Sequence, residues 1–379
     1  MKKCEVIFKI MKAVAVICEY NPFHNGHICL LREIKKAFPE YATISVMSGS
    51  AVQRGDFAVQ GKYVRAERAL KNGSDLVFEL PFPFSVSAAE QFAKAGVYIS
   101  RSVKADVLAF GSESGDLTAL KRAAERLGSS CFEAELKKEI ASAPDESFIS
   151  LRERAYKNLY GEKLFDSGND ILALEYLKNT EKYRDIVPFA VHRTAPFSAT
   201  AARKAMFGED LEEIERLFPE KRVRGETHGG LKELSQLVLG YLRLAKSGDT
   251  GSGIRNAIKQ AAVRASDFDS FVNGLPTKTY TLARLRREII AMLFDVTEEE
   301  KNAVPEYTVL LGATEKGLLY LSEKKKDISL PLLTKKADAR MLSERGRAQL
   351  EKAELCDSIF ALGMKKEIGA FFKTPIILK

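Results

Sequence analysis

Residues 13–30, AVAVICEYNPFHNGHICL, begin as an apolar run and continue as a polar, turn-rich segment. The first six residues are apolar and partly β-branched, which is typical of a buried strand. The dipeptide NP at 21–22 favours a turn, and HNGH at 24–27 follows where helical spacing begins. The stretch therefore predicts a strand, a tight turn and a helix that opens on two histidines.

The same alternation of strand and helix patterns recurs along the first half of the chain. Further apolar, β-branched runs cover residues 43–47, 76–79 and 107–110. Helical spacing separates them at 63–70, 88–100 and 117–127. This order predicts an α/β fold, with a Rossmann-like parallel sheet. Ligands of such sheets bind beyond the carboxyl ends of the strands, and turn-rich segments follow the four strands at 19–27, 48–56, 80–85 and 111–116.

The pattern changes near Gly208. A helix-like segment, a candidate strand and a loop that enters a helix precede it, at 169–178, 185–193 and 197–208. Beyond it the spacing is mostly helical, at 211–217, 231–244, 254–263 and 280–293, and residues 307–317 and 328–336 have the character of short strands. We therefore predict a catalytic domain over 11–207 and a mostly α-helical second domain over 208–379.

Length, composition and charge bound the function. The chain has 379 residues, 45% of them hydrophobic and 29% charged, which is ordinary for a soluble protein of two domains. The net charge of +8 fits either an acidic partner or a solvated basic surface. The five cysteines are odd in number and form no C-x-x-C pair, which favours a reducing compartment such as the cytoplasm.

The chain shows neither an export signal nor a membrane anchor in its sequence pattern. Charged residues interrupt the apolar character of MKKCEVIFKI at 1–10, and no later apolar run reaches the length of a membrane span. Because Met11-Lys12 immediately precedes the first strand, we interpret residues 1–10 as an upstream extension or a mis-assigned start. The sequence does not define an oligomeric state.

The HNGH segment suits an anion. A helix that starts after a strand presents backbone N–H groups and a favourable dipole to a phosphate, and histidines at i and i+3 share one face. Gly26 lets the backbone approach a ligand closely. Two other interpretations remain: a metal site that uses the nearby Cys18 and Cys29, and a capping loop whose histidines satisfy local backbone groups. The metal interpretation lacks suitably spaced further ligands, and we predict no metal ligands.

Longer motifs resemble a known family. H-x-G-H after a first strand is typical of the nucleotidyltransferase superfamily, and the bacterial tRNA(Met) cytidine acetate ligases resemble this chain in MKAVAVICEYNPFHNGH, VMSGSAVQRGDFAV, GSDLVFELP, FGSESGD and SATAARKAM. The resemblance covers residues 11–207 well. Beyond them it rests on KTYTLARLRRE and LPLLTKKAD, at 278–288 and 330–338.

The resemblance implies an ATP-dependent ligase that forms acetyl-adenylate, releases pyrophosphate and then acetylates the wobble cytidine of elongator tRNA(Met). Acetate, ATP with Mg²⁺, and this tRNA are thus the expected partners, and His24 and His27 the expected catalytic residues. The expected ATP-binding residues are Ile17, Cys18, Glu19, Tyr20, Asn21, Pro22, Phe23, His24, Asn25, Gly26, His27, Ile28, Cys29, Leu30, Gly111, Asn169 and Arg193.

Three further groups carry two interpretations each. By resemblance, a pyrophosphate loop comprises Ser198, Thr200, Arg203 and Lys204; an ordinary N-capped helix is the alternative. Residues 53–56 orient acetate or the incoming base, or form an exposed turn held by an Arg–Asp pair. Candidate tRNA contacts are Lys278, Arg284, Arg286 and Arg287, with Tyr280 available to stack; a basic surface helix that buries Leu282, Leu285 and Ile289 is the alternative.

Other functions compete with the ligase. A small-molecule adenylyltransferase that makes a nucleotide cofactor explains the first domain but not the second, and a non-catalytic tRNA-binding module leaves the intact HNGH segment without a role. A class I synthetase is disfavoured because no K-M-S-K-S-like loop follows the sheet. We interpret Lys62, Arg65 and Arg68, which recur along one helical face, as a solvated surface.

Overall fold

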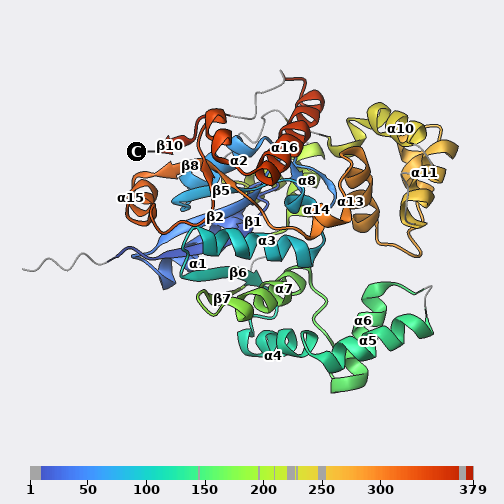
Figure 1. Cartoon of the computed structure of the whole chain (residues 1–379), viewed down its shortest axis with the longest axis horizontal. Helices are drawn as coiled ribbons and strands as arrows, with labels where there is room; N and C mark the ends of the chain where they lie inside the picture. The colour runs from blue at the N-terminus through green and yellow to red at the C-terminus, as the bar shows by residue number, and fades with distance from the viewer. Residues whose placement is uncertain are drawn as a thin grey trace, which may run out of the picture.

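The computed structural model describes residues 10–143, 146–194, 197–208, 210–219, 227, 229–245, 253–366 and 373–378. Its main sheet has the strand order β10-β8-β5-β2-β1-β6-β7, and β9 pairs with β8 at its side (Figure 1). The strands are β1 (Ala13–Cys18), β2 (Ala42–Ser48), β5 (Leu76–Leu80), β6 (Val107–Ser112), β7 (Val187–His192), β8 (Thr308–Thr314), β9 (Leu332–Leu333) and β10 (Ile376–Leu378). The predicted α/β fold and its first five strands are confirmed.

Strand β1 lies in the interior of the sheet. It pairs in parallel with β2 on one side, where Ala13 is opposite Ala42, and with β6 on the other, where Val14 is opposite Val107. The chain therefore leaves β1 toward one edge of the sheet and later returns to its other side. Such a reversal opens a crevice at the carboxyl ends of the strands, and the loop after β1 lies there.

Helices cover both faces of this sheet. α1 (Asn25–Ala37) and α2 (Lys62–Lys71) pack on one face, through residues such as Leu31 and Ala66, while α3 (Ala89–Ser102) and α7 (Gly168–Tyr183) pack on the other. Apolar residues at helical spacing form the buried sides of these helices, which is why their positions follow from the sequence.

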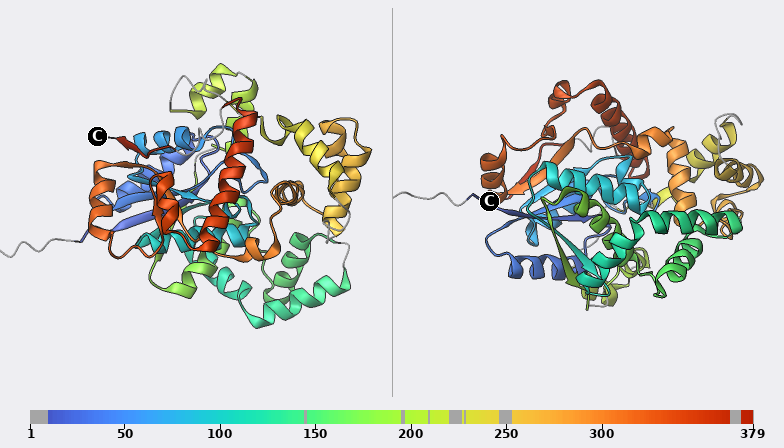
Figure 2. Two further views of the ribbon diagram at one scale, coloured as in Figure 1. Left: turned by 45° about the horizontal axis from the view of Figure 1, so that its top comes forward. Right: turned by 60° about the horizontal axis from the view of Figure 1, so that its bottom comes forward.

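Two groups of helices project from the sheet on the side away from β10 (Figures 1 and 2). The first continues from α4 (Leu117–Leu127) into α5 (Ser130–Ser142) and α6 (Phe148–Tyr160), which pack on each other. The sequence analysis did not anticipate α5 or α6. Ser129 and Ser147 cap their first turns by accepting backbone N–H bonds.

The second group follows α8 (Ala199–Gly208) and α9 (Leu211–Leu217). It contains α10 (Ser235–Leu244), α11 (Gly253–Arg264), α12 (Phe268–Asn273), α13 (Leu282–Leu293) and α14 (Glu298–Asn302). The predicted helix over 231–244 begins only at Ser235, because Gly230 has a φ of +72° and a short 3₁₀ turn, η2 (Gly230–Lys232), precedes it. Phe57 and Phe82 share the hydrophobic core of this group.

The end of the chain returns to the sheet. β8 pairs antiparallel with β5 and parallel with β10, and α15 (Glu315–Lys324) follows β8. The short strands expected near 307–317 and 328–336 are thus present as β8 and β9. A long helix, α16 (Glu344–Gly363), then packs its Phe360 into the core of the second helical group. The sheet takes strands from both sides of Gly208, and the division into two domains there stays a prediction.

Candidate active site

The two histidines of the HNGH segment form the N-terminal cap of α1. The backbone N–H of Gly26 donates to Nδ1 of His24 at 3.1 Å, and the backbone N–H of His24 donates to Nδ1 of His27 at 3.1 Å. Their rings stack with centroids 3.8 Å apart. The two histidines thus satisfy local backbone N–H groups, as the capping interpretation predicts.

Both Nδ1 atoms accept a hydrogen bond, so in the neutral rings each proton resides on Nε2. Burial, together with Arg193 and Arg203, lowers the pKa of His24 to about 4, and burial, His24 and Arg193 hold the pKa of His27 well below its ordinary value. The pair is neutral near pH 7. It thus presents two Nε2–H donors without carrying a charge itself.

We expect this cap to make stability depend on pH. The pKa of His24 is lower in the folded chain than in the unfolded one, so the unfolded chain binds more protons and stability falls as pH drops from about 6.5 toward 4. Urea unfolding of the wild type and of His24→Asn across this window measures the effect. Asparagine caps helices but does not titrate, so equal slopes for the two proteins would contradict the assignment.

A cavity of about 560 Å³ is lined by Gly26, which lies between the two histidines in the sequence. Gly26, Gly111 and Arg193 line it, as do Cys29 and Leu30. A Cβ atom at Gly26 would lie 2.9 Å from Cε1 of His24, and one at Gly111 would lie 2.9 Å from Cδ of Arg193, so a side chain at either position would displace a residue of the site. The structure thus brings together five of the residues predicted to bind ATP.

Other residues of the predicted ATP segment are buried or hydrogen-bonded within the fold itself. Ile17, Tyr20, Phe23 and Ile28 are buried in the hydrophobic clusters on the two faces of the sheet. Pro22 lies buried in the turn. The side chain of Cys18 reaches the carbonyl oxygen of Val46, that of Asn21 accepts the N–H of Val59, and that of Asn25 donates to the carbonyl of Arg216. These side chains hold the loop in place.

The loop after β6 is held by two carboxylates that the sequence analysis missed. Asp170 is buried and accepts hydrogen bonds from the Ser112 hydroxyl at 2.5 Å and the Ser114 N–H at 3.1 Å. Glu113 accepts from the Asn169 amide and lies 3.7 Å from Nε of Arg193. Asn169 and Arg193 are therefore joined through Glu113. The only sequence signal was that Asp170 directly follows the predicted Asn169.

Arg54 of the loop between residues 52 and 56 and Arg203 of α8 converge beside the histidines. Arg203 of α8 donates to the Asn21 carbonyl at 2.8 Å and to the Thr200 hydroxyl at 3.2 Å, and Arg54 donates to the same hydroxyl at 3.2 Å. Burial and the neighbouring Arg54 lower the pKa of Arg203. These hydrogen bonds end on neutral oxygens, so the two guanidinium groups can also bind a polyphosphate.

The other two residues of the predicted pyrophosphate loop, Ser198 and Lys204, have different surroundings. The Ser198 hydroxyl accepts the Ala201 N–H at 3.1 Å, which makes it a helix cap. Lys204 is exposed on α8. Glu19 lies within the arginine cluster, where burial raises its pKa and its carboxylate accepts the Gln53 N–H at 2.7 Å.

The predicted solvated face of α2 is wrong. Lys62, Arg65 and Arg68 are all buried. Arg65 donates to the carbonyls of Glu19 at 2.6 Å and Ser48 at 3.0 Å, so it ties the loops after β1 and β2 together, and burial lowers its pKa to about 10. These carbonyls come from other loops of the fold, and the helical spacing of α2 alone does not reveal them.

The hairpin between β3 (Ala51–Val52) and β4 (Asp56–Phe57) connects this site to α13. Asp56 pairs with Arg286 at 3.6 Å, and the carbonyl of Gln53 accepts a hydrogen bond from Arg287 at 3.2 Å. The Arg–Asp pair expected to hold this turn is thus formed with an arginine of α13. Arg54 instead reaches Thr200.

The structure divides the basic segment 278–287. Arg286 and Arg287 contact the hairpin, whereas Lys278 and Arg284 are exposed. Leu285 and Ile289 face the core as expected, but Leu282 is exposed, which corrects its assignment to the buried side. Within the described part of the chain, His, Cys, Asp and Glu side chains do not gather in groups of three or more that could hold a metal ion.

Comparisons with known proteins match nearly the whole chain. A family model described as HIGH Nucleotidyl Transferase matches residues 11–370. The protein named tRNA(Met) cytidine acetate ligase of Thermoanaerobacter sp. (strain X514) is 32% identical over 97% of this chain and 100% of its own, and that of Geobacillus sp. (strain WCH70) is 34% identical over 86% and 89%.

Two crystal structures of Thermotoga maritima TmcAL are similar to the fold. The apo form has a TM-score of 0.90 at 27% identity, and the form bound with alpha-thio ATP has a TM-score of 0.89 at 28% identity. Each alignment covers 97% of this chain and 100% of the other. Across the residues that our structure describes, none of the helices combines the length and apolar character that crossing a membrane requires.

Proposed function

This chain belongs to the tRNA(Met) cytidine acetate ligases among the HIGH nucleotidyl transferases, and from that premise we propose how its site works. ATP binds along the crevice at the carboxyl end of β1, with its nucleoside toward the cavity lined by Gly26, Gly111 and Arg193. The triphosphate lies toward Arg54 and Arg203. An ATP analogue bound to the related Thermotoga maritima protein supports nucleotide binding by this fold.

In the first step, an acetate oxygen attacks the α-phosphorus, the bond to the bridging oxygen breaks, and pyrophosphate leaves. This reaction needs alignment and stabilisation of charge on the phosphoryl oxygens more than it needs a protein nucleophile. The observation that carries the proposal is the neutral histidine pair, whose Nδ1 atoms are occupied by the cap and whose Nε2–H groups remain as donors. Burial raises the pKa of the Cys18 thiol, which disfavours it as a nucleophile.

In the second step, the exocyclic amine of the wobble cytidine of elongator tRNA(Met) attacks the acetyl carbonyl, and AMP leaves with the electrons of the anhydride bond. We assign docking of the tRNA to the helical region beyond Gly208, where Lys278 and Arg284 are exposed. The reaction takes place in the cytoplasm. This localisation is supported by the free thiols of Cys18, Cys29, Cys131 and Cys356.

Mg²⁺ enters with the substrate in this proposal. The ion usually keeps several waters and is held by substrate phosphates with one or two carboxylates, so it needs no dedicated protein cage. Glu19 is one carboxylate located within the arginine cluster. When bound, the ion neutralises charge on the departing pyrophosphate.

We expect the purified protein to exchange radiolabelled pyrophosphate into ATP only when acetate and Mg²⁺ are present. Exchange requires a reversible adenylate, so it reports the first step without tRNA. Formate, propionate and a phosphorylated cofactor precursor serve as comparison substrates. Acetate-independent incorporation, or AMP transfer to the phosphorylated precursor alone, would assign the site to a small-molecule adenylyltransferase.

A further inference from the structure

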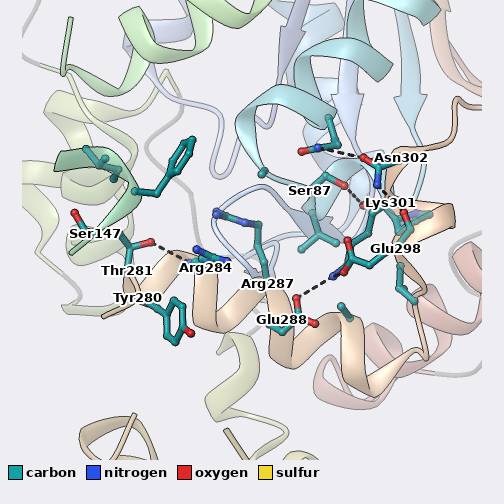
Figure 3. Close-up of a pocket in the computed structure, with 18 of the residues that line it drawn as sticks. Ser87, Ser147, Tyr280, Thr281, Arg284, Arg287, Glu288, Glu298, Lys301 and Asn302 are labelled. Atoms are coloured by element: carbon teal, nitrogen blue, oxygen red, sulfur yellow. Dashed lines mark hydrogen bonds and ion pairs between the residues drawn. The ribbon is translucent and has the colours of Figure 1, made fainter. Parts of the chain in front are cut away.

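A second cavity, of about 480 Å³, lies between α13, the start of α6 and the segment 83–91 (Figure 3). Its size falls within the range of ligand-binding clefts. Phe148 and Ile149 on its rim are 49% and 56% exposed, so the cavity is open to solvent.

The two ends of this cavity differ in charge. At one end, Lys301 pairs with Glu288 at 2.9 Å and with Glu298 at 2.8 Å. Glu288 also pairs with Arg255 at 2.5 Å, so the two carboxylates are offset by two cations. At the other end, Arg284 and Arg287 extend from α13 into the same space (Figure 3). We call this second part, lined by Tyr280, Arg284, Arg287 and Phe148, the basic-aromatic end.

The basic-aromatic end has the composition of a nucleotide site. The guanidinium of Arg284 lies 5.0 Å from the ring centroid of Tyr280, and Arg287 donates to a backbone carbonyl, so neither interaction places a carboxylate against these cations. Unpaired RNA bases stack on aromatic rings and guanidinium planes, while exposed arginines meet the phosphates.

One hairpin separates this end from the catalytic loop. Arg287 donates to the carbonyl of Gln53. The backbone N–H of Gln53 in turn donates to Glu19, which precedes the HNGH segment in the loop after β1. Gly55, with a φ of +78°, allows the hairpin to approach α13 this closely, because a Cβ there would lie 2.4 Å from the backbone nitrogen of Arg287. Two hydrogen bonds through Gln53 thus join the basic-aromatic end to the loop after β1.

We propose that the basic-aromatic end binds an unpaired nucleotide of the tRNA, close in sequence to the cytidine that is acetylated. The base stacks on Tyr280 and its phosphate meets Arg284. This inference rests on the proposed function and adds to it a subsite for a second nucleotide. The subsite holds the loop while the target base enters the active site.

The test measures dissociation constants for tRNA(Met) and for its anticodon stem-loop across a salt series. Tyr280→Ala should weaken binding about 10-fold, because one stacking contact is lost, and Tyr280→Phe should restore it. Arg284→Ala should reduce the slope of log affinity against log salt by about 0.7, as one single-strand phosphate contact is removed. Arg264→Ala, which removes an exposed charge from the end of α11, is the matched control.

The outcomes separate the subsite from the function. Wild-type protein that shows acetate-dependent exchange but binds tRNA equally well as Tyr280→Ala and Arg284→Ala would overturn the subsite alone. An equal loss in Arg264→Ala would assign the effect to overall charge and also overturn it. Absence of exchange in the wild type would instead overturn the proposed function. If Tyr280→Ala folds poorly, Arg284→Ala still tests the site, because its salt dependence is measured independently.

Discussion

Replacing His27 with alanine should lower the rate of acetate-dependent pyrophosphate exchange by about 10²–10³-fold. The reason is the lost Nε2–H donor, since a donor aimed at developing charge stabilises a transition state by roughly 2.7–4 kcal/mol. The KM for ATP should change much less, because the donor acts on charge that appears only during the reaction. Steady-state exchange kinetics at several ATP concentrations measure both values.

The control addresses the second role of His27, its cap bond to the N–H of His24. Losing a cap costs about 1 kcal/mol of stability. Glutamine at this third helical position can reach back to the cap residue, as in a capping box. We expect His27→Gln to recover stability but not the rate. Exchange at the wild-type rate in His27→Ala, or a rate that recovers together with stability in His27→Gln, would remove this residue from catalysis.

Replacing Lys62 with methionine should lower the free energy of unfolding by about 3–5 kcal/mol. The ammonium of Lys62 is buried between Glu79 of β5, at 2.9 Å, and Asp357 of α16, at 2.7 Å. Removing it leaves two carboxylates together without a cation, and breaking a buried ion pair from one side has a cost of this size. Urea unfolding measures it. Lys71→Met, an exposed lysine of the same helix paired with Glu67, is the control and should change stability by less than about 0.5 kcal/mol.

The deficit of Lys62→Met should depend on pH. Burial raises the pKa of Glu79 even beside Lys62, and without the lysine this pKa rises further. The folded variant then binds more protons than the unfolded chain above the ordinary glutamate pKa, so its stability falls as pH rises. We expect a larger loss relative to wild type at pH 8 than at pH 5. A loss that does not change across this range would mean that packing, not charge, is the cause.

The local pattern of the sequence determined much of the fold and the centre of the site. Strands β1, β2, β5 and β6 are short apolar runs, and the order of strand, turn and helix places the HNGH segment at the carboxyl end of β1. Such features depend on neighbours within a few residues, so periodicity and turn chemistry reveal them. The resemblance of the motifs then indicated the family that the comparisons support.

Tertiary structure alone decided what the charged residues do. Lys62 and Arg65 have the helical spacing of a solvated face, yet their partners include Asp357, 295 positions away, and the carbonyls of two other loops. Arg284 and Arg287 lie about one turn apart on α13, but only Arg287 donates to the hairpin, and Arg284 is exposed. Asp170 of α7 accepts a hydrogen bond from Ser112 of β6 because the fold brings these two elements together. The physical reason is that a buried charge is stable only beside a partner, and folding, rather than sequence spacing, brings that partner close.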